Sequence, residues 1–381
     1  MLCEAEIREL FPIVHNKIYL DSGSKCAVPM PVYERLCRFY NECFLEGRQY
    51  DAWWDELEQV RQKLARLIGT TGQEIGFFSS TTHAVNVVAQ GLGWQTGDNV
   101  VVCAQEFPSN LYPWLHLREK GVEVRLLKAK DGHLDPQQYE ALMDASTKLV
   151  AVSHVQAATG YKSDLTALGQ LCKKYNALFF VDATQSCGLF PIDVDAAQID
   201  FLCASAYKWL LGTDGLAFLY GRRQSQRRLE FVYRGWAGRT APNDYTHHRF
   251  DYPDSIRRFE LGNHNYSAVC ALGTGLDLLD QLGPQQVLGR TTECVAWLKD
   301  CIKHSACLKL AYDFDSANTG ALVVVQTNSD PEPLFRHLAS QHITAALKPN
   351  GIRLSPYFYN TKEEVAHAVQ VMDAYCRQNG F

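Results

Sequence analysis

Two stretches decide the fold of this chain: "LFFVDATQ" at residues 178–185 and "FLCASAYKWLLG" at residues 201–212. Each begins with a continuous apolar run and then turns polar. Such runs are typical of strands that are buried on both faces of a parallel sheet. Asp182 follows the first run and Lys208 follows the second. A lysine among apolar neighbours is rarely buried without a partner, so its surroundings need an explanation.

Further apolar runs alternate with amphipathic stretches around these two. The strands predicted between Thr81 and Tyr220 are 99–103, 122–127, 148–153, 178–182, 201–205 and 216–220. The helices predicted between them are 109–121, 135–145 and 164–176. Strands that alternate with helices indicate βαβ units. We therefore predict an α/β fold with a mainly parallel sheet sandwiched by helices.

The pattern changes near residue 281. Helices are predicted at 283–305, 330–341 and 361–379, and strands at 320–327 and 351–358. This mixture predicts a smaller C-terminal α+β domain. The predicted division gives a large domain at 17–280 and a small domain made of 1–16 and 281–381.

Composition narrows the class of protein. The chain has 381 residues, 46% of them hydrophobic, and a net charge of -5 without a long basic run, so no nucleic-acid partner is expected. Its apolar runs are too short to cross a bilayer, and its beginning lacks an apolar signal core, which favours a cytoplasmic protein away from membranes. The 13 cysteines are scattered without a CxxC pair. Reduced thiols and no metal site are expected.

Asp182 and Lys208 suggest a particular chemistry. Ligands of parallel sheets collect at the carboxyl ends of the strands, where both residues lie. An aldehyde cofactor bound there would form a Schiff base with the lysine, and the carboxylate would keep a ring nitrogen protonated. Those are the requirements of pyridoxal 5'-phosphate. Hydroxyls at Thr81, Thr82 and Ser205 suit its phosphate, because the two threonines precede a predicted helix.

The whole chain resembles fold-type-I pyridoxal-phosphate enzymes of the class V aminotransferase family. That group includes cysteine desulfurases, C–S lyases, isopenicillin-N-epimerase-like enzymes and kynureninase. The resemblance runs from "IYLDSGS" at 18–24 to "GIRLSPYFYNTKEEV" at 351–365. It implies a sheet of the seven-stranded type in the large domain, and a homodimer with shared active sites that acts on a small amino acid.

The resemblance also implies roles for individual residues. Lys208 would be the catalytic residue that attaches the cofactor, Asp182 would pair with its ring nitrogen, and Gln185 would reach its phenolic oxygen. Phe107 would stack on the ring, and Arg353 would bind the substrate carboxylate. The residues implied to hold the phosphate are Thr81, Thr82, Ser205, Tyr207 and, from the neighbouring subunit, Asn263.

Each of these residues has a plainer interpretation that the sequence leaves open. Lys208 could be a surface lysine, Asp182 a helix cap, Arg353 a surface arginine and Phe107 an ordinary core residue. The chain departs from the desulfurase pattern at Gln156 or Ala157, where an asparagine is usual. A catalytically inactive scaffold of the same fold is the non-enzyme alternative.

The expected reaction begins with loss of the proton at Cα of a small L-amino acid. We expect a C–S lyase that eliminates sulfur from cysteine or an S-substituted cysteine. Desulfurases carry a nucleophilic cysteine shortly before the arginine of the substrate site, whereas this chain has none between Cys307 and Cys376. The sequence therefore disfavours a persulfide-forming desulfurase. A class V aminotransferase and an amino-acid epimerase are the alternatives.

Overall fold

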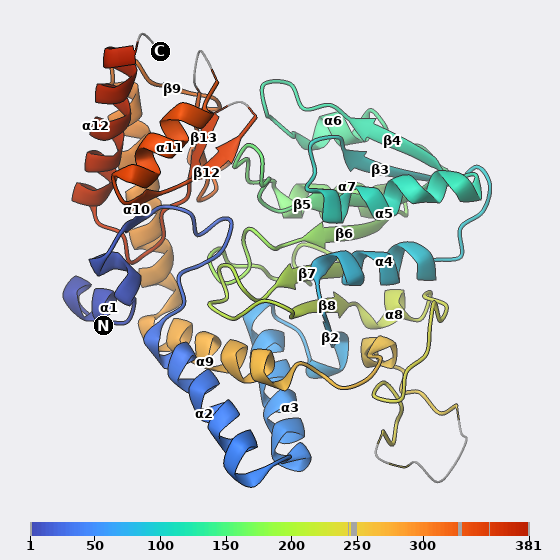
Figure 1. Ribbon diagram of the computed structural model, residues 1–381. Coiled ribbons are helices and arrows are strands. Elements are labelled where there is room, and N and C mark those ends of the chain that lie inside the picture. The colour runs from blue at the N-terminus through green and yellow to red at the C-terminus, as the bar shows by residue number, and fades with distance from the viewer. Residues whose placement is uncertain (1, 243, 245–249, 327–329, 350, 380–381) are drawn as a thin grey trace.

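The central sheet follows the predicted α/β pattern. The computed structural model describes residues 2–242, 244, 250–326, 330–349 and 351–379 (Figure 1). In these residues the largest sheet has seven strands in the order β2-β8-β7-β6-β5-β3-β4. Their bounds are Ile75–Phe78 for β2, Asn99–Cys103 for β3, Glu123–Leu127 for β4, Thr147–Ser153 for β5, Leu178–Asp182 for β6, Phe201–Ser205 for β7 and Ala217–Gly221 for β8. Strands β4, β3, β5, β6 and β7 pair in parallel, while β8 is antiparallel to β7 and β2. The predicted fold class is confirmed.

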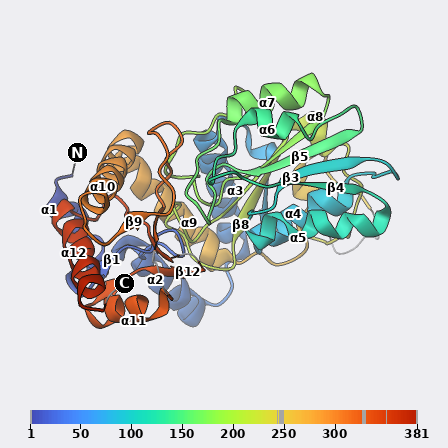
Figure 2. The ribbon, with the colours of Figure 1, turned by 90° about the horizontal axis from the view of Figure 1, so that it is seen from above.

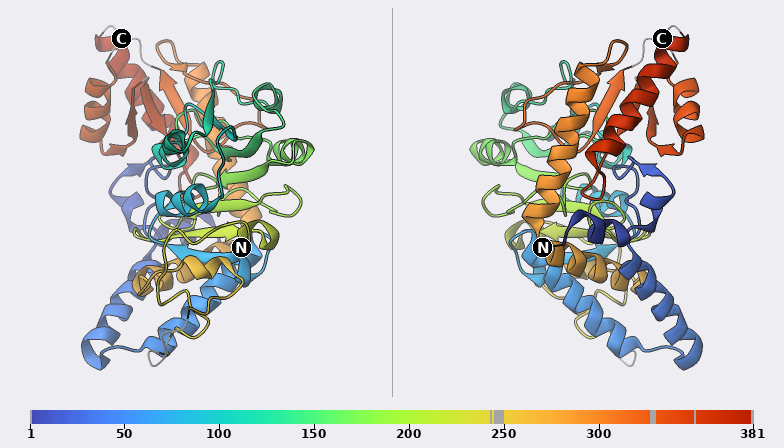
Figure 3. Two further views of the ribbon diagram at one scale, coloured as in Figure 1. Left: turned by 90° about the vertical axis from the view of Figure 1, so that its right-hand side faces the viewer. Right: turned by 90° about the vertical axis from the view of Figure 1, so that its left-hand side faces the viewer.

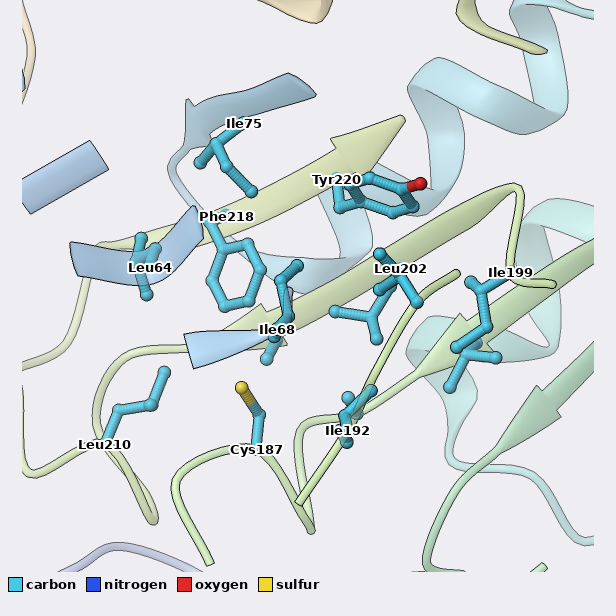
Figure 4. Packing of buried hydrophobic residues seen from close by; sticks show 14 of the residues in the cluster. Leu64, Ile68, Ile75, Cys187, Ile192, Ile199, Leu202, Leu210, Phe218 and Tyr220 are labelled. Atoms are coloured by element: carbon cyan, nitrogen blue, oxygen red, sulfur yellow. The ribbon is translucent and has the colours of Figure 1, made fainter. Parts of the chain in front are cut away.

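Both faces of this sheet are buried. In β6, Leu178 and Phe180 pack in the cluster that includes α4 (Thr81–Gly91) and α5 (Tyr112–Leu115). Phe179 and Val181 pack in the cluster that includes α3 (Tyr50–Leu67), α7 (Leu165–Lys174) and α9 (Tyr266–Leu282). Figure 4 shows part of this second cluster. Because successive residues of a strand point to opposite faces, a strand covered on both sides must be apolar throughout.

The remaining helices of this part are α2 (Met30–Glu46), α6 (Pro136–Glu140) and α8 (Arg223–Gln226), with short 3-10 turns at 72–74, 108–110, 116–120 and 256–259. Helix α1 (Glu4–Glu9) and the 3-10 turn at 12–15 contribute Ile7 and Val14 to a separate apolar cluster. Figure 3 shows α2 and α3, in blue, at the end of the molecule opposite the C-terminus. Asp135 begins α6 with a capping box, and the Asp164 carboxylate accepts the Ala167 N–H at the start of α7 (3.0 Å). These polar residues satisfy N–H groups that have no partner inside the helix.

A second sheet lies to one side of the central one (Figure 2). Its order is β12-β13-β10-β9, with bounds Lys309–Leu310 for β9, Val323–Gln326 for β10, Ala346–Lys348 for β12 and Gly351–Leu354 for β13. It packs with α10 (Pro284–Lys303), α11 (Glu332–Ser340) and α12 (Lys362–Asn379). Near it, β1 (Ile18–Tyr19) pairs with β11 (Ile343–Thr344). The apolar cluster of this part also includes Ile7 and Phe11. The domain boundaries stay a prediction.

Two local expectations differ from the structure. The predicted helix 109–121 is broken into a 3-10 turn, the four-residue α5 and a second 3-10 turn. Pro113 lies in this segment and cannot donate a backbone hydrogen bond, which limits how far a regular helix can extend. Strand β2 was not predicted, since its four residues directly precede a polar run. Among the described residues, no helix combines the length and the apolar character that crossing a bilayer requires.

Candidate active site

Three polar side chains lie at the carboxyl ends of neighbouring strands. Asp182 ends β6, Ser205 ends β7 and Ser153 ends β5, where it pairs in register with Asp182. Alternate residues of a strand point to the same face of the sheet. In each of these strands, the apolar residues two and four positions before the polar one pack in the cluster with α4, so all three polar side chains lie on the face that α4 covers. Helix α4 begins at Thr81. Polar strand ends and a helix N-terminus therefore share one face of the sheet.

A tight loop holds Lys208 beside these strand ends. The Ala206 N–H donates to the Leu216 carbonyl (3.0 Å), and the Leu211 N–H donates to the Lys208 carbonyl (3.0 Å). Leu211 has a φ of 59°, which is uncommon for a residue with a side chain. The loop packs against Gly188 (φ 94°), where a Cβ would lie 2.4 Å from the Trp209 carbonyl oxygen. Glycine at this position lets the segment after Asp182 approach the lysine loop closely.

The Lys208 amine is buried and electrostatically perturbed. Its residue is 7% exposed, and burial lowers its pKa to about 8, assisted by Arg353 and opposed by Asp182. Burial raises the pKa of Asp182, while the Thr184 backbone N–H, which donates to its carboxylate (2.9 Å), and the charge of Lys208 act in the opposite direction. An amine with a pKa near neutrality can be a nucleophile and a proton carrier under physiological conditions.

Two aromatic rings flank this amine. The Lys208 Nζ atom is 5.9 Å from the ring centre of Phe107 and 5.8 Å from that of Tyr207. Phe107 is 53% exposed. An aromatic side chain that is half exposed beside a buried amine leaves apolar surface available for a flat ligand.

Arg353 reaches the same region from the second sheet. It lies in β13, is buried, and donates to the Ala157 carbonyl (3.0 Å), the Ser24 hydroxyl (2.7 Å) and the Asp21 carboxylate (3.4 Å). Its Nε atom is buried with no hydrogen-bond partner in the described residues. Burial lowers the pKa of Arg353, and Asp21 opposes this shift.

Lys348 in β12 adds another positive charge. Burial lowers the pKa of Lys348, and Arg353 lowers it further. Lys348 also lowers the pKa of Lys208, whereas Asp21 raises it. The region therefore concentrates positive charge, as an anionic ligand requires.

The hydrogen bonds of three other predicted cofactor residues differ from one another. The Gln185 amide donates to the Gly23 carbonyl (2.8 Å) and accepts from the Trp209 indole (3.0 Å). Thr82, in the first turn of α4, pairs with the Ser109 hydroxyl (2.8 Å). The Ser205 hydroxyl is buried and makes no well-formed hydrogen bond with the described residues.

Asn263 is not brought to this group within one chain. It is exposed in the segment before α9, and no hydrogen bond joins it to the other predicted site residues among those described.

Sequence reasoning missed two charged residues of this region. Glu106 precedes Phe107 and is buried, while Lys348 acts electrostatically on Lys208. A signal for Glu106 was available, because it follows the predicted strand 99–103 and ligands of parallel sheets collect at the carboxyl ends of the strands. Lys348 offered no such signal, since only the folded second sheet places it near Arg353.

Residues 18–367 match the family model described as aminotransferase class-V. This chain belongs to the class V aminotransferase family. A probable cysteine desulfurase of Methanothermobacter thermautotrophicus is 30% identical, covering 94% of this chain and 95% of that protein. The apo structure of a cysteine desulfurase from Thermococcus onnurineus is similar over 99% of both chains, with a TM-score of 0.90 and 25% identity. A structure of the cystine C–S lyase C-DES with its reaction product cysteine persulfide covers 95% of this chain and 99% of the other, with a TM-score of 0.88 and 20% identity.

Membership in the class V aminotransferase family confirms the predicted cofactor, pyridoxal 5'-phosphate. The residues present fit that group. The buried Ser205 hydroxyl is available to a phosphate, the Phe107 ring is open to stacking, and the Lys208 amine lies over that ring. An amine, a carboxylate and a cationic cluster lie around the place where the cofactor would bind.

One expectation about this family member is wrong. Persulfide formation was disfavoured because no cysteine lies between Cys307 and Cys376, yet the chain matches proteins named cysteine desulfurases over nearly their full length. The physical reason is that a loop cysteine concerns only where the sulfur goes after the C–S bond breaks, so its absence from one segment could not exclude persulfide formation.

Proposed function

We propose that this chain is a pyridoxal-phosphate enzyme that cleaves the Cβ–S bond of cysteine or of cystine and passes the sulfur on as a persulfide. The observation that carries this proposal is the full-length similarity to proteins named cysteine desulfurases. The arrangement of Lys208, Asp182 and Arg353 supports it, because those residue types suit the binding and activation of an amino acid.

Each residue has a proposed task. The chemistry that pyridoxal 5'-phosphate supplies when bound is withdrawal of electrons from Cα of the substrate. Lys208 holds the cofactor and carries the proton that leaves Cα. Asp182 keeps the ring nitrogen protonated, and Arg353 binds the substrate carboxylate through its planar guanidinium. Phe107 covers one face of the ring.

The remaining tasks concern the phosphate and the phenolic oxygen. Thr81, Thr82, Ser205 and Tyr207 hold the phosphate at the start of α4. The Gln185 amide nitrogen carries two hydrogens, of which the Gly23 carbonyl accepts one, so the second is available to the phenolic oxygen.

The atoms and electrons of C–S bond cleavage balance without a thiol from the protein. With cystine, the Cα proton and the Cβ–S bond are lost, the leaving group takes a proton as cysteine persulfide, and one water releases pyruvate and ammonia. With cysteine and an added acceptor thiol, the sulfur moves to the thiol as a persulfide and alanine remains. Both routes use the same proton transfer by Lys208.

The test supplies the holoenzyme with L-cystine and measures persulfide by cyanolysis alongside pyruvate. In a second arm it supplies L-cysteine and dithiothreitol, whose second thiol closes the persulfide to a cyclic disulfide and releases sulfide, and it measures sulfide alongside alanine. We expect persulfide to match pyruvate in the first arm and sulfide to match alanine in the second, with neither product from Lys208→Ala. Amino transfer to an added keto acid without sulfur release would identify an aminotransferase instead. Deuterium incorporation at Cα with an inverted product would identify an epimerase.

We also infer that the working unit is a homodimer. Helix α2 carries large apolar side chains at the surface, with Phe44 85%, Leu45 76% and Tyr40 60% exposed. Exposed apolar clusters of this kind mark interfaces between proteins. A second copy of the chain is the proposed occupant, and Asn263 would then complete the partner's phosphate site.

A further inference from the structure

Glu106 is a buried carboxyl that none of the roles above uses. It lies in the loop after β3, directly before Phe107, and is 5% exposed. One of its oxygens accepts the Ser153 backbone N–H (2.7 Å), and the other accepts the Ser153 hydroxyl. Because Ser153 pairs in register with Asp182, Glu106 lies beside the strand ends of the candidate site.

The same carboxyl holds the side chain of Gln156. The Gln156 Nε2 atom donates to Glu106 Oε1 at 2.5 Å. Gln156 is 1% exposed, and its Oε1 atom is buried with no hydrogen-bond partner in the described chain. Its neighbour Ala157 supplies the carbonyl that binds Arg353. A buried amide oxygen without a partner is costly, so a ligand or a rearrangement of the amide is expected to satisfy it.

We propose that Glu106 is a positioning residue of the cofactor site, which determines whether Gln156 presents its amide oxygen or its amide N–H groups to the bound cofactor. This inference rests on the proposed binding of pyridoxal 5'-phosphate between Lys208 and Asp182. An ionised Glu106 accepts Nε2, which leaves the amide oxygen free. A protonated Glu106 donates to that oxygen once the amide has turned over, which frees both N–H groups for an acceptor such as the phenolic oxygen.

The surroundings of Glu106 allow both states near neutral pH. Burial raises its pKa to about 7, and Asp182 acts in the same direction. The other titratable groups that interact with it are Cys103 on β3, Cys203 on β7 and Tyr139 on α6. Burial raises the pKa of each of these three, so they are neutral near pH 7. Of these four groups, Asp182 is therefore the one whose charge acts on Glu106 near neutral pH.

The experiment measures the affinity of pyridoxamine 5'-phosphate for the full-length apoprotein by calorimetry at pH 6 and pH 8. This probe has no aldehyde, so it binds without a covalent link to Lys208. Glu106→Gln is neutral at both pH values. We expect it to match the wild type at pH 6 and to bind about 3- to 10-fold more tightly than the wild type at pH 8, as one altered hydrogen bond allows. Each ratio compares the variant with the wild type at one pH, so a change in the protonation of the probe itself cancels.

Asp200→Asn is the matched control. Asp200 accepts a backbone N–H from Phe179 (2.8 Å) and a hydroxyl from Ser225, and burial raises its pKa, but it precedes β7 at the opposite end of the sheet. Its affinity ratio to the wild type should be the same at both pH values. In a Gln156→Ala background, Glu106→Gln should have no further effect.

Two results would overturn the proposal. One is a Glu106→Gln ratio that is equal at pH 6 and pH 8. The other is an effect of Glu106→Gln that persists in the Gln156→Ala background, since Glu106 would then act on the cofactor without the amide. If Glu106→Gln does not fold, Gln156→Ala alone decides, because its affinity should change less between the two pH values than that of the wild type. Failure of the wild type to bind the probe at all would overturn the proposed function as well.

Discussion

The Nζ atom of Lys208 lies 5.9 Å from the ring centre of Phe107, and the amine is buried whereas the ring is half exposed. The two residues come from loops after different strands, β7 and β3. A flat ligand bound between them would cover the exposed ring and would contact the buried amine.

Phe107→Ala should therefore weaken cofactor binding while leaving the apoprotein almost as stable as before. Loss of ring stacking is expected to lower the affinity for pyridoxal 5'-phosphate by about 0.5–1.5 kcal/mol. The free energy of unfolding of the apoprotein should change by only about 0.5 kcal/mol, because the side chain is exposed. Absorbance titration and urea denaturation measure the two quantities. Tyr112→Ala, an exposed residue of α5, is the control, and equal losses of affinity in both variants would contradict the stacking role.

Lys208→Met should stabilise the apoprotein at pH 7. Burial lowers the pKa of Lys208 to about 8, so between about pH 8 and its ordinary value of 10.5 the unfolded chain binds more protons than the folded chain. The folded state is thus penalised below pH 8, and the penalty disappears as the pH rises to about 10.5. We expect a gain of up to about 3 kcal/mol at pH 7 that shrinks as the pH rises above about 8. Urea denaturation of apoprotein at pH 7 and pH 10 checks this, and a gain that is independent of pH would refute it.

Arg353→Lys should raise KM for the amino-acid substrate more than it lowers kcat. Lysine keeps the charge but loses the planar fork that binds a carboxylate with two parallel hydrogen bonds. An increase in KM of about tenfold or more is expected, which corresponds to about 1.5–3 kcal/mol for a charged hydrogen bond. Arg336→Lys, on the surface of α11, should leave KM unchanged. An unchanged KM in Arg353→Lys would remove the arginine from the substrate site.

Glu260→Ala should strongly destabilise the protein. Glu260 is fully buried, pairs with Arg61 at 2.7 Å and accepts the Phe77 N–H of β2 at 2.8 Å. Removal of Glu260 leaves the buried Arg61 with the longer pair to Glu58 (3.2 Å) and leaves the Phe77 N–H without its acceptor, and breaking such a buried pair costs about 3–5 kcal/mol. Thermal unfolding measures the loss. The control is Glu332→Ala, whose exposed partner is Arg336 and whose removal should cost about 1 kcal/mol or less. A similar small loss at Glu260 would show that the pair contributes little.

Phe44→Asp should shift the protein toward the monomer. A charge placed in the exposed apolar surface of α2 would have to be desolvated in a dimer interface. Sedimentation equilibrium is the measurement, and activity per chain should fall with the dimer fraction if the sites are shared. Trp297→Asp on α10 introduces the same charge at another exposed aromatic residue and should not change the mass. A wild type that sediments as an active monomer would exclude the shared site.

Most of the central sheet could be predicted because its strands are short, apolar throughout and followed by polar residues. The predicted strands at 99–103, 178–182 and 201–205 agree with β3, β6 and β7 in both bounds. Strand β2 escaped prediction because four apolar residues before a helix carry little periodic signal. The helix expected at 109–121 failed where Pro113 limits regular hydrogen bonding.

The candidate site was predictable where a residue follows a strand and not where it depends on tertiary folding. Lys208 and Asp182 could be paired from their positions after β7 and β6. The contacts of Arg353 with Asp21 and Ala157 join segments far apart in the sequence, so periodicity carries no information about them. The resemblance to relatives supplied Arg353, but it gave no indication of the neighbouring Lys348.

The Arg353 guanidinium has a consequence for the order of events during synthesis. It joins β13 to Asp21, 332 residues earlier in the chain. At about 5–20 residues per second, the ribosome makes those two residues roughly 15 to 70 seconds apart. The segment with Lys208 emerges well before Arg353. A nascent chain therefore contains the amine long before the guanidinium that helps to lower its pKa in the folded protein, and a prematurely ended chain never gains that guanidinium.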